Sequence, residues 1–164
     1  MLDPEFLILF RTTRAEHDLS NVMQQADQEG RDPDQQQRHD EHLLARVIRG
    51  YQPGARFLGI AGSVRRGSHN RRLIRAAGDT LPSGVELVEW EGLAGLPIFD
   101  EDLESDPPVS VQDFLDEVEA ADALLIATPE YNHGVPGVLK NAIDWASRPP
   151  RGSVLAGKPT AIFG

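Results

Sequence analysis

The sequence predicts an α/β protein built as a three-layer, doubly wound parallel sheet. Two short apolar runs, Arg56 to Ala61 and Ala123 to Thr128, have the composition of strands that are buried on both faces. Segments with helix-spaced apolar residues alternate with the strand-like runs, as in successive βαβ units. Because the carboxyl ends of parallel strands meet at one edge of a sheet, the loops that follow the two runs are expected to lie together.

The segment after the first strand is predicted to hold a helix and the second strand. Its apolar residues at helical spacing are Leu73, Ile74 and Ala77. The turn residues from Leu81 to Gly84 are expected to end this helix. The second strand is then predicted at Val85 to Trp90.

A further helix is expected after the loop that ends at Pro107 and Pro108. Its apolar residues, spaced i, i+3, i+4 and i+7, are Val111, Phe114, Leu115 and Val118. Ser110 and Asp113 resemble a capping box at its start.

The third strand, Ala123 to Thr128, is apolar almost throughout and is therefore expected at the centre of the sheet. Pro136 suits the first turn of the next helix. The buried stripe of that helix is predicted to be Val138, Leu139, Ala142, Ile143 and Trp145. Lys158 to Phe163 begins a fourth strand, and the chain stops at Gly164.

The sequence predicts two parts, an N-terminal extension (1–55) and a ligand-binding domain (56–164). Within the extension, Gln24 to Gln37 is too polar to fold alone, which predicts partial disorder. Asp34 to Arg49 has the apolar spacing of one amphipathic helix that packs on the domain. Phe6 to Phe10 is a candidate extra strand.

The composition excludes several classes of function. The 164 residues include no cysteine, which rules out disulfides, thiolate catalysis and cysteine-based metal sites. A formal charge of −10 disfavours a broad nucleic-acid or membrane surface. The apolar N-terminal run is too short for a signal sequence or a membrane span, so a cytoplasmic protein is expected.

The loop from Gly62 to Asn70 has the chemistry of a phosphate site. It leads from a strand into a helix, whose N-terminal N–H groups favour an anion. Gly62 and Gly67 are expected to let the backbone approach the phosphate, and Ser63, Ser68 and Asn70 offer polar side chains. Five arginines, of which Arg65 is best placed for a bidentate contact, lie within eleven residues, Arg65 to Arg75. An N-capped helix with surface arginines is the alternative interpretation.

The loop from Pro129 to Gly134 suits a flat heterocycle. Pro129 restricts the backbone, and Gly134 removes a side chain where a ring can approach. Backbone N–H groups from Glu130 to Asn132 are expected to face the polar edge of the ring. The two loops together indicate a site for flavin mononucleotide (FMN). His133 is interpreted as an exposed or packed residue rather than a catalytic acid, and no metal site is predicted.

At these residues the chain resembles the NADPH-dependent FMN reductase family, which includes chromate and quinone reductases. The matching stretches are Gly59 to Arg72, Leu96 to Asp102 and Ala121 to Trp145. The resemblance implies a flavodoxin-like fold with strand order 2-1-3-4-5 and bound FMN that takes hydride from NAD(P)H and reduces a small-molecule acceptor, such as a quinone, free flavin or a metal oxyanion. It implies that the phosphate is held by Ser63, Arg65, Ser68 and Asn70, and the ring by Pro129, Glu130, Tyr131, Asn132 and Gly134.

The resemblance also implies that the elements after the fourth strand are missing, about a third of the family fold. The fourth strand would then be an open edge, which we expect the N-terminal segment or a second subunit to cover. A homo-oligomer is therefore expected. Two other interpretations stay open: a non-catalytic fragment that acts through association, and a module that binds another phosphorylated ligand.

Overall fold

The computed structural model describes residues 7–10, 51, 53–148 and 152–164, and within them the predicted alternation of strands and helices is confirmed. The strands are β1 (Leu7–Phe10), β2 (Arg56–Ala61), β3 (Glu86–Trp90), β4 (Ala123–Ala127) and β5 (Thr160–Phe163). The α-helices are α3 (His69–Gly78), α4 (Val109–Ala120) and α5 (Gly137–Ala146), and two 3₁₀ turns span Gly92–Gly95 and Glu101–Leu103. The predicted helix at Asp34 to Arg49 and the linker at Gln24 to Gln37 lie outside the described residues.

The five strands form one sheet in the order β1-β5-β4-β2-β3. The pairs β3–β2, β2–β4 and β4–β5 are parallel, which confirms the predicted order 2-1-3-4 for the domain strands. β1 pairs antiparallel with β5, Leu7 opposite Phe163 and Phe10 opposite Thr160. The predicted extra strand is therefore confirmed at Leu7–Phe10, and it covers the edge of β5 that would otherwise be open.

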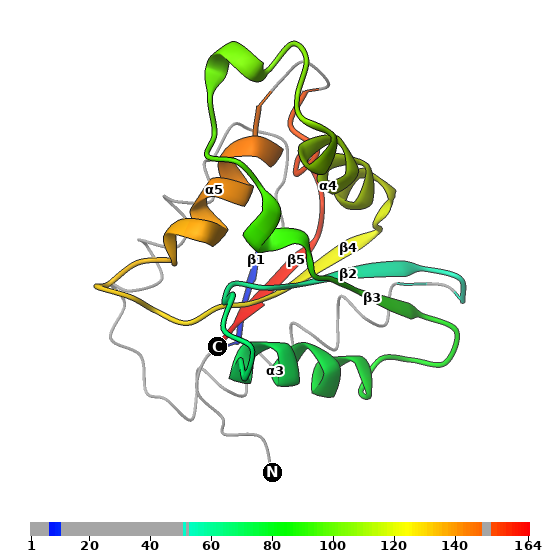
Figure 1. Ribbon diagram of the computed structural model, residues 1–164. Helices are drawn as coiled ribbons and strands as arrows, with labels where there is room; N and C mark the ends of the chain where they lie inside the picture. The colour runs from blue at the N-terminus through cyan, green and yellow to red at the C-terminus, as the bar shows by residue number, and fades with distance from the viewer. Residues whose placement is uncertain (1–6, 11–50, 52, 149–151) are drawn as a thin grey trace.

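Helices cover both faces of the sheet, and the strand residues alternate between them (Figure 1). Leu58, Ile60 and Ile126 are buried on the face that packs against α4 and α5. Phe57, Leu125 and neighbouring strand residues are buried on the opposite face, where Ile74 of α3 joins them. Strands that are apolar on both faces are thus explained by two separate cores, one on each side of the sheet.

Two details of the predicted helices are wrong. α4 begins at Val109 with Pro108 as its N-cap, and no side-chain hydrogen bond caps it, so Ser110 and Asp113 do not form the predicted capping box. Proline suits this position because the first N–H groups of a helix need no internal partner. α3 ends at Gly78, ahead of the predicted turn, where Leu87 of β3 lies 2.7 Å from the position a Gly78 Cβ would take.

Within the described part of the chain, none of the helices has the length and apolar character needed to cross a membrane.

Candidate functional site

The two loops leave adjacent parallel strands at the same level, so the predicted meeting of the loops is confirmed. Ala61 and Ala127, the last residues of β2 and β4, are register partners. The next residue of the first loop, Gly62, donates its N–H to the carbonyl of Ala127 over 2.7 Å. In Figure 1 both loops lie at the left of the sheet, beyond the ends of β2 and β4. This is the edge at which open α/β sheets bind ligands.

Gly62 has a different role from the one predicted. Its backbone is not in the left-handed region, and a Cβ there would lie 2.6 Å from Thr128 Oγ1 and 3.0 Å from Leu139 Cδ2. The missing side chain lets the two loop beginnings pack together, rather than letting the backbone bend toward an anion. A Cβ on Gly67, by contrast, would meet no atom within 4 Å.

The first loop leads into α3 and caps its N-terminus. Ser68 is the N-cap residue, 5% exposed, and its Oγ accepts from the N–H of Arg71 over 3.4 Å. The N–H of Ser68 donates to the carbonyl of Arg65 over 3.1 Å, and Ser63 Oγ accepts from the N–H of Arg65 over 3.4 Å. The ten-residue helix thus presents its first N–H groups and the positive end of its dipole to this loop.

Asn70 is a second buried polar residue at this end of the helix. It lies in the first turn of α3 and is only 7% exposed. The buried side-chain atoms without a partner in the described chain are Glu89 Oε1 and Glu104 Oε1, and neither amide atom of Asn70 is one of them. The burial of Asn70 therefore places an amide at the start of α3 but does not by itself require a ligand.

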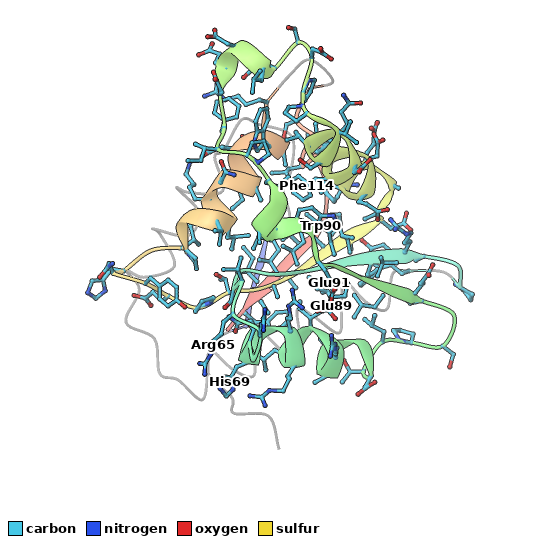
Figure 2. The ribbon with its side chains drawn as sticks, in the orientation of Figure 1. Arg65, His69, Glu89, Trp90, Glu91 and Phe114 are labelled. Atoms are coloured by element: carbon cyan, nitrogen blue, oxygen red, sulfur yellow. The ribbon has the colours of Figure 1, made fainter. Side chains whose placement is uncertain are left out.

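The predicted cluster of five arginines divides into two groups. Arg71 pairs with Glu91 at 3.2 Å, and Arg75 pairs with Glu89 at 2.8 Å, so both are tied to the β3 side of the helix. Figure 2 shows Glu89 and Glu91 on the sheet side of α3, and Arg65 and His69 at its N-terminal end, away from those carboxylates. Arg71 and Arg75 therefore join the helix to the sheet and do not add free charge to the loop.

The tip of the second loop is a tight two-residue turn. The N–H of Tyr131 donates to the carbonyl of Gly134 over 2.9 Å, and the N–H of Gly134 donates back to Tyr131 over 3.2 Å. Asn132 and His133 between them have φ values of 53° and 60°. Two consecutive left-handed residues define a type I′ turn, in which asparagine is favoured and histidine is strained. The loop is thus held in one conformation without a ligand.

This turn changes one prediction for the second loop. The N–H of Tyr131 is occupied by Gly134, so of the three predicted ring-facing N–H groups only those of Glu130 and Asn132 remain. Tyr131 itself is 58% exposed. His133 is 90% exposed, with Nδ1 3.3 Å from Glu130 Oε1, which agrees with its interpretation as a surface residue.

Gly134 leaves free space at the base of the turn. A Cβ there would meet only the carbonyl oxygen of Tyr131, at 3.9 Å, and its backbone is not left-handed. Neither packing nor conformation in the described chain therefore requires glycine at this position. A ligand that approaches the backbone closely is a sufficient reason for it.

The helix after the second loop is anchored by a polar network that the sequence analysis did not identify. Asn141 accepts from the N–H of Phe99 over 2.7 Å and donates to the carbonyl of Pro97 over 2.9 Å. Trp145 Nε1 donates to the same carbonyl over 2.9 Å, and its ring packs edge-on against Phe99. Trp145 is 3% exposed, so it belongs to the core and is not available for a subunit contact.

Two further groups with shifted pKa values lie away from the loops. Burial lowers the pKa of Lys158, although Asp122 and Glu119 act in the opposite direction. Burial and the charge of Asp122 raise the pKa of Tyr51, whose hydroxyl donates to the Asp122 carbonyl. Both groups lie near the C-terminal end of α4, at the edge of the sheet opposite the two loops.

A cavity of about 230 Å³ lies at the other end of α5 from the second loop. It is lined by Ser105, Asp106, Pro107, Gln112, Leu115, Arg148, Gly152 and Val154. None of the predicted site residues borders it.

Over the described residues, no group of three or more His, Asp or Glu side chains is arranged to hold a metal ion. The two histidines three residues apart in the N-terminal segment, His39 and His42, lie outside that part of the chain.

Comparison with known proteins gives this arrangement a family. Residues 55–164 match the model of the NADPH-dependent FMN reductase family, so the chain belongs to that family. It is 47% identical over 110 residues to an NAD(P)H-dependent FMN reductase of Pseudomonas aeruginosa. The aligned region covers 66% of this chain and 58% of that protein. It is also 47% identical over 105 residues to a 2-hydroxy-1,4-benzoquinone reductase of a Burkholderia species, covering 64% of this chain and 57% of the relative.

The fold has a matching solved structure. FerB from Paracoccus denitrificans, described as a flavoenzyme NAD(P)H:(acceptor) oxidoreductase, superposes with a TM-score of 0.60 at 37% identity. The match covers 66% of this chain and 59% of FerB. The flavodoxin-like fold is therefore confirmed, and the chain spans a little over half the length of the relatives it matches.

Proposed function

We propose that this chain binds FMN across the two loops and, with NAD(P)H as co-substrate, is an oxidoreductase that reduces a small-molecule acceptor. The observation that carries the proposal is the meeting of the two loops at one edge of the sheet, with the buried polar residues Ser68 and Asn70 at the N-terminus of α3. The Gly62–Ala127 hydrogen bond holds this helix end beside the second loop. A ligand with a phosphate at one end and a flat polar ring at the other fits both halves of the site.

The residues present fit FMN in their chemistry. Ser63, Arg65, Ser68 and Asn70 would hold the phosphate, because they combine hydroxyl, amide and guanidinium donors with a helix N-terminus. Pro129, Glu130, Tyr131, Asn132 and Gly134 would hold the isoalloxazine, through the free N–H groups of the turn and the space at Gly134. When bound, the flavin supplies hydride acceptance from NAD(P)H and electron delivery to an acceptor.

The side chains of the site need supply no acid or base for this reaction. Their part is to bind and orient the cofactor, and the strained turn does so without first having to order a loop. The names of the relatives favour a quinone as acceptor, and free flavin or a metal oxyanion stays an alternative.

We also propose a homo-oligomer that works in the cytoplasm, with residues 56–164 as the flavin-binding domain and 1–55 as its extension.

An absorbance spectrum after desalting tests the proposal, followed by titration of the FMN-free chain with FMN. The expected result is a flavin spectrum that survives desalting, or restored binding on titration. Asn70→Asp keeps the size of the side chain but places a negative charge beside the phosphate, so it should weaken FMN binding strongly. Gln112→Glu is the control, since it makes the same amide-to-carboxylate change on α4, away from both loops.

Two results would contradict the proposal. A chain that stays colourless and takes up no FMN would favour a non-catalytic member that acts through association. A chain that binds inorganic phosphate or another phosphorylated ligand but not FMN would favour a binding module for that ligand.

A further inference from the structure

The cavity of about 230 Å³ lies between the first turn of α4 and the end of α5, away from the two loops. All of its lining residues belong to the described part of the chain. Figure 1 shows these two helix ends side by side in the upper part of the view. The space exceeds the about 10–15 Å³ that one water molecule requires, and it is smaller than the about 300–1,000 Å³ of pockets for drug-sized ligands. Its size therefore suits a small metabolite.

Hydrogen bonds between neighbouring segments hold the walls of this cavity. Gln112 Nε2 donates to the carbonyl of Pro107 over 2.6 Å, which joins α4 to the loop before it. The N–H of Val154 donates to the carbonyl of Ala146 over 3.1 Å, which joins the segment after α5 to the last residue of that helix. Leu115 of α4 is 5% exposed and gives the cavity an apolar wall. The cavity is therefore formed before any ligand binds.

Two opposite charges line this cavity, the carboxylate of Asp106 and the guanidinium of Arg148. Among the described residues, no ion pair joins them to each other or to another charged side chain. The guanidinium of Arg148 lies instead over the ring of Phe99, with Cζ 5.4 Å from the ring centroid. Because stacking on an aromatic face leaves the N–H groups at the edge of a guanidinium free to donate, Arg148 can bind a carboxylate while Phe99 holds it.

We propose that this cavity is a binding site for a free α-amino acid with a small apolar side chain. The carboxylate of the ligand pairs with Arg148, its ammonium group pairs with Asp106, and its side chain lies against Leu115 and Val154. A ligand with only one sign of charge would pair with one of the two charged residues and be repelled by the other. The site goes beyond the proposed oxidoreductase function and does not depend on it.

Three probes with the same carbon branch test the assignment of the two charges. L-Leucine carries both charges, 4-methylpentanoate lacks the ammonium group, and 3-methylbutylamine lacks the carboxylate. Ligand-observed NMR titration of the full chain should show that L-leucine binds about tenfold more tightly than either analogue. Each analogue has lost one charge-assisted contact, which is the reason for its weaker binding.

Asp106→Asn and Arg148→Gln separate the two ends of the ligand. Asp106→Asn should weaken L-leucine about tenfold and leave 4-methylpentanoate no weaker, because that probe makes no use of the Asp106 charge. Arg148→Gln should weaken L-leucine to a similar degree and leave 3-methylbutylamine no weaker. Asp102→Asn is the matched control, since it makes the same change at an exposed residue of the same loop that does not line the cavity. It should leave all three affinities unchanged.

Three results would overturn the proposal. The first is an unchanged chain that does not bind L-leucine at millimolar concentration. The second is equal affinity for the three probes, which would mean that the charges of the cavity do not select the ligand. The third is L-leucine binding that neither Asp106→Asn nor Arg148→Gln weakens, which would place the amino acid elsewhere.

The fate of this site can be separated from that of the proposed function. Asp106 lies in neither of the two loops, so Asp106→Asn should bind FMN as the unchanged chain does. Loss of the amino-acid site therefore leaves the FMN proposal standing. If the chain takes up no FMN, the same three probes still decide whether the cavity binds an amino acid.

Discussion

Gly62 lies so close to Thr128 that a Cβ on the glycine would sit 2.6 Å from Thr128 Oγ1 and 2.9 Å from Thr128 Cβ. The two residues begin the two loops of the candidate site, and each follows the last residue of a buried strand. Thr128 in turn donates its N–H to the carbonyl of Phe163 in β5. The spacing between the loops is thus set by packing within the sheet and not by a ligand.

Gly62→Ala is expected to destabilise the chain by about 1–3 kcal/mol, because the added methyl overpacks the contact with Thr128 and Leu139. Gly67→Ala is the control in the same loop, since its Cβ would enter open space and its φ is not positive. Urea unfolding of the two variants measures the difference. Equal stabilities would show that the backbone at Gly62 can move aside without cost.

Arg65→Ala is expected to weaken FMN binding by about 1.5–3 kcal/mol through loss of a charge-assisted contact. Arg75→Ala should leave FMN affinity unchanged, because Arg75 is paired with Glu89 on the sheet side of α3. Fluorescence titration with FMN compares the two variants. If both bind FMN equally well, Arg65 does not belong to the site.

Gly134→Val is expected to reduce FMN affinity while leaving the far-UV circular dichroism spectrum unchanged. The structure has room for a Cβ at this position, 3.9 Å from the carbonyl oxygen of Tyr131, so the added side chain enters the proposed ligand space and not the core. Gly137→Ala, at the first residue of α5 with open space around its Cβ position, is the control. Global unfolding of Gly134→Val would instead show a structural role for the glycine.

The type I′ turn leads to a further prediction, on how substitutions at its two central residues change FMN affinity. Asn132→Gly and His133→Gly should both retain FMN affinity, because glycine readily adopts the positive φ found at these residues. His133→Val should weaken FMN binding, since a β-branched residue disfavours this conformation and distorts the turn. FMN titration of the three variants shows whether these residues act through the conformation of the turn or through their side chains. Loss of binding in His133→Gly would point to a direct contact by the imidazole.

Deletion of residues 1–10 is expected to increase self-association, because it removes β1 and exposes the backbone edge of β5. Sedimentation velocity at several protein concentrations measures this change. The full chain under the same conditions is the reference. A deleted chain with an unchanged sedimentation profile and an unchanged unfolding midpoint would show that β1 does not protect this edge.

The local patterns of the sequence were enough to predict the core of the fold. β2 and β4 are short apolar runs, and the helix-spaced residues of α4, such as Phe114 and Val118, are buried as predicted. The strand pattern is a continuous apolar run and the helix pattern repeats every 3.6 residues, and both depend on neighbours along the chain. The residues proposed to bind the cofactor could be selected in the same way, because they lie in two continuous loops, and their role stays a prediction.

The tertiary structure decided which of these residues have partners elsewhere. That Arg71 and Arg75 are paired while Arg65 is not depends on Glu89 of β3 and on Glu91, which directly follows that strand later in the chain. The role of Gly62 likewise depends on Thr128, and the closing of the β5 edge depends on Leu7–Phe10. Such contacts join segments that are distant in sequence, so no local period encodes them. They exist only once the sheet has brought the segments together.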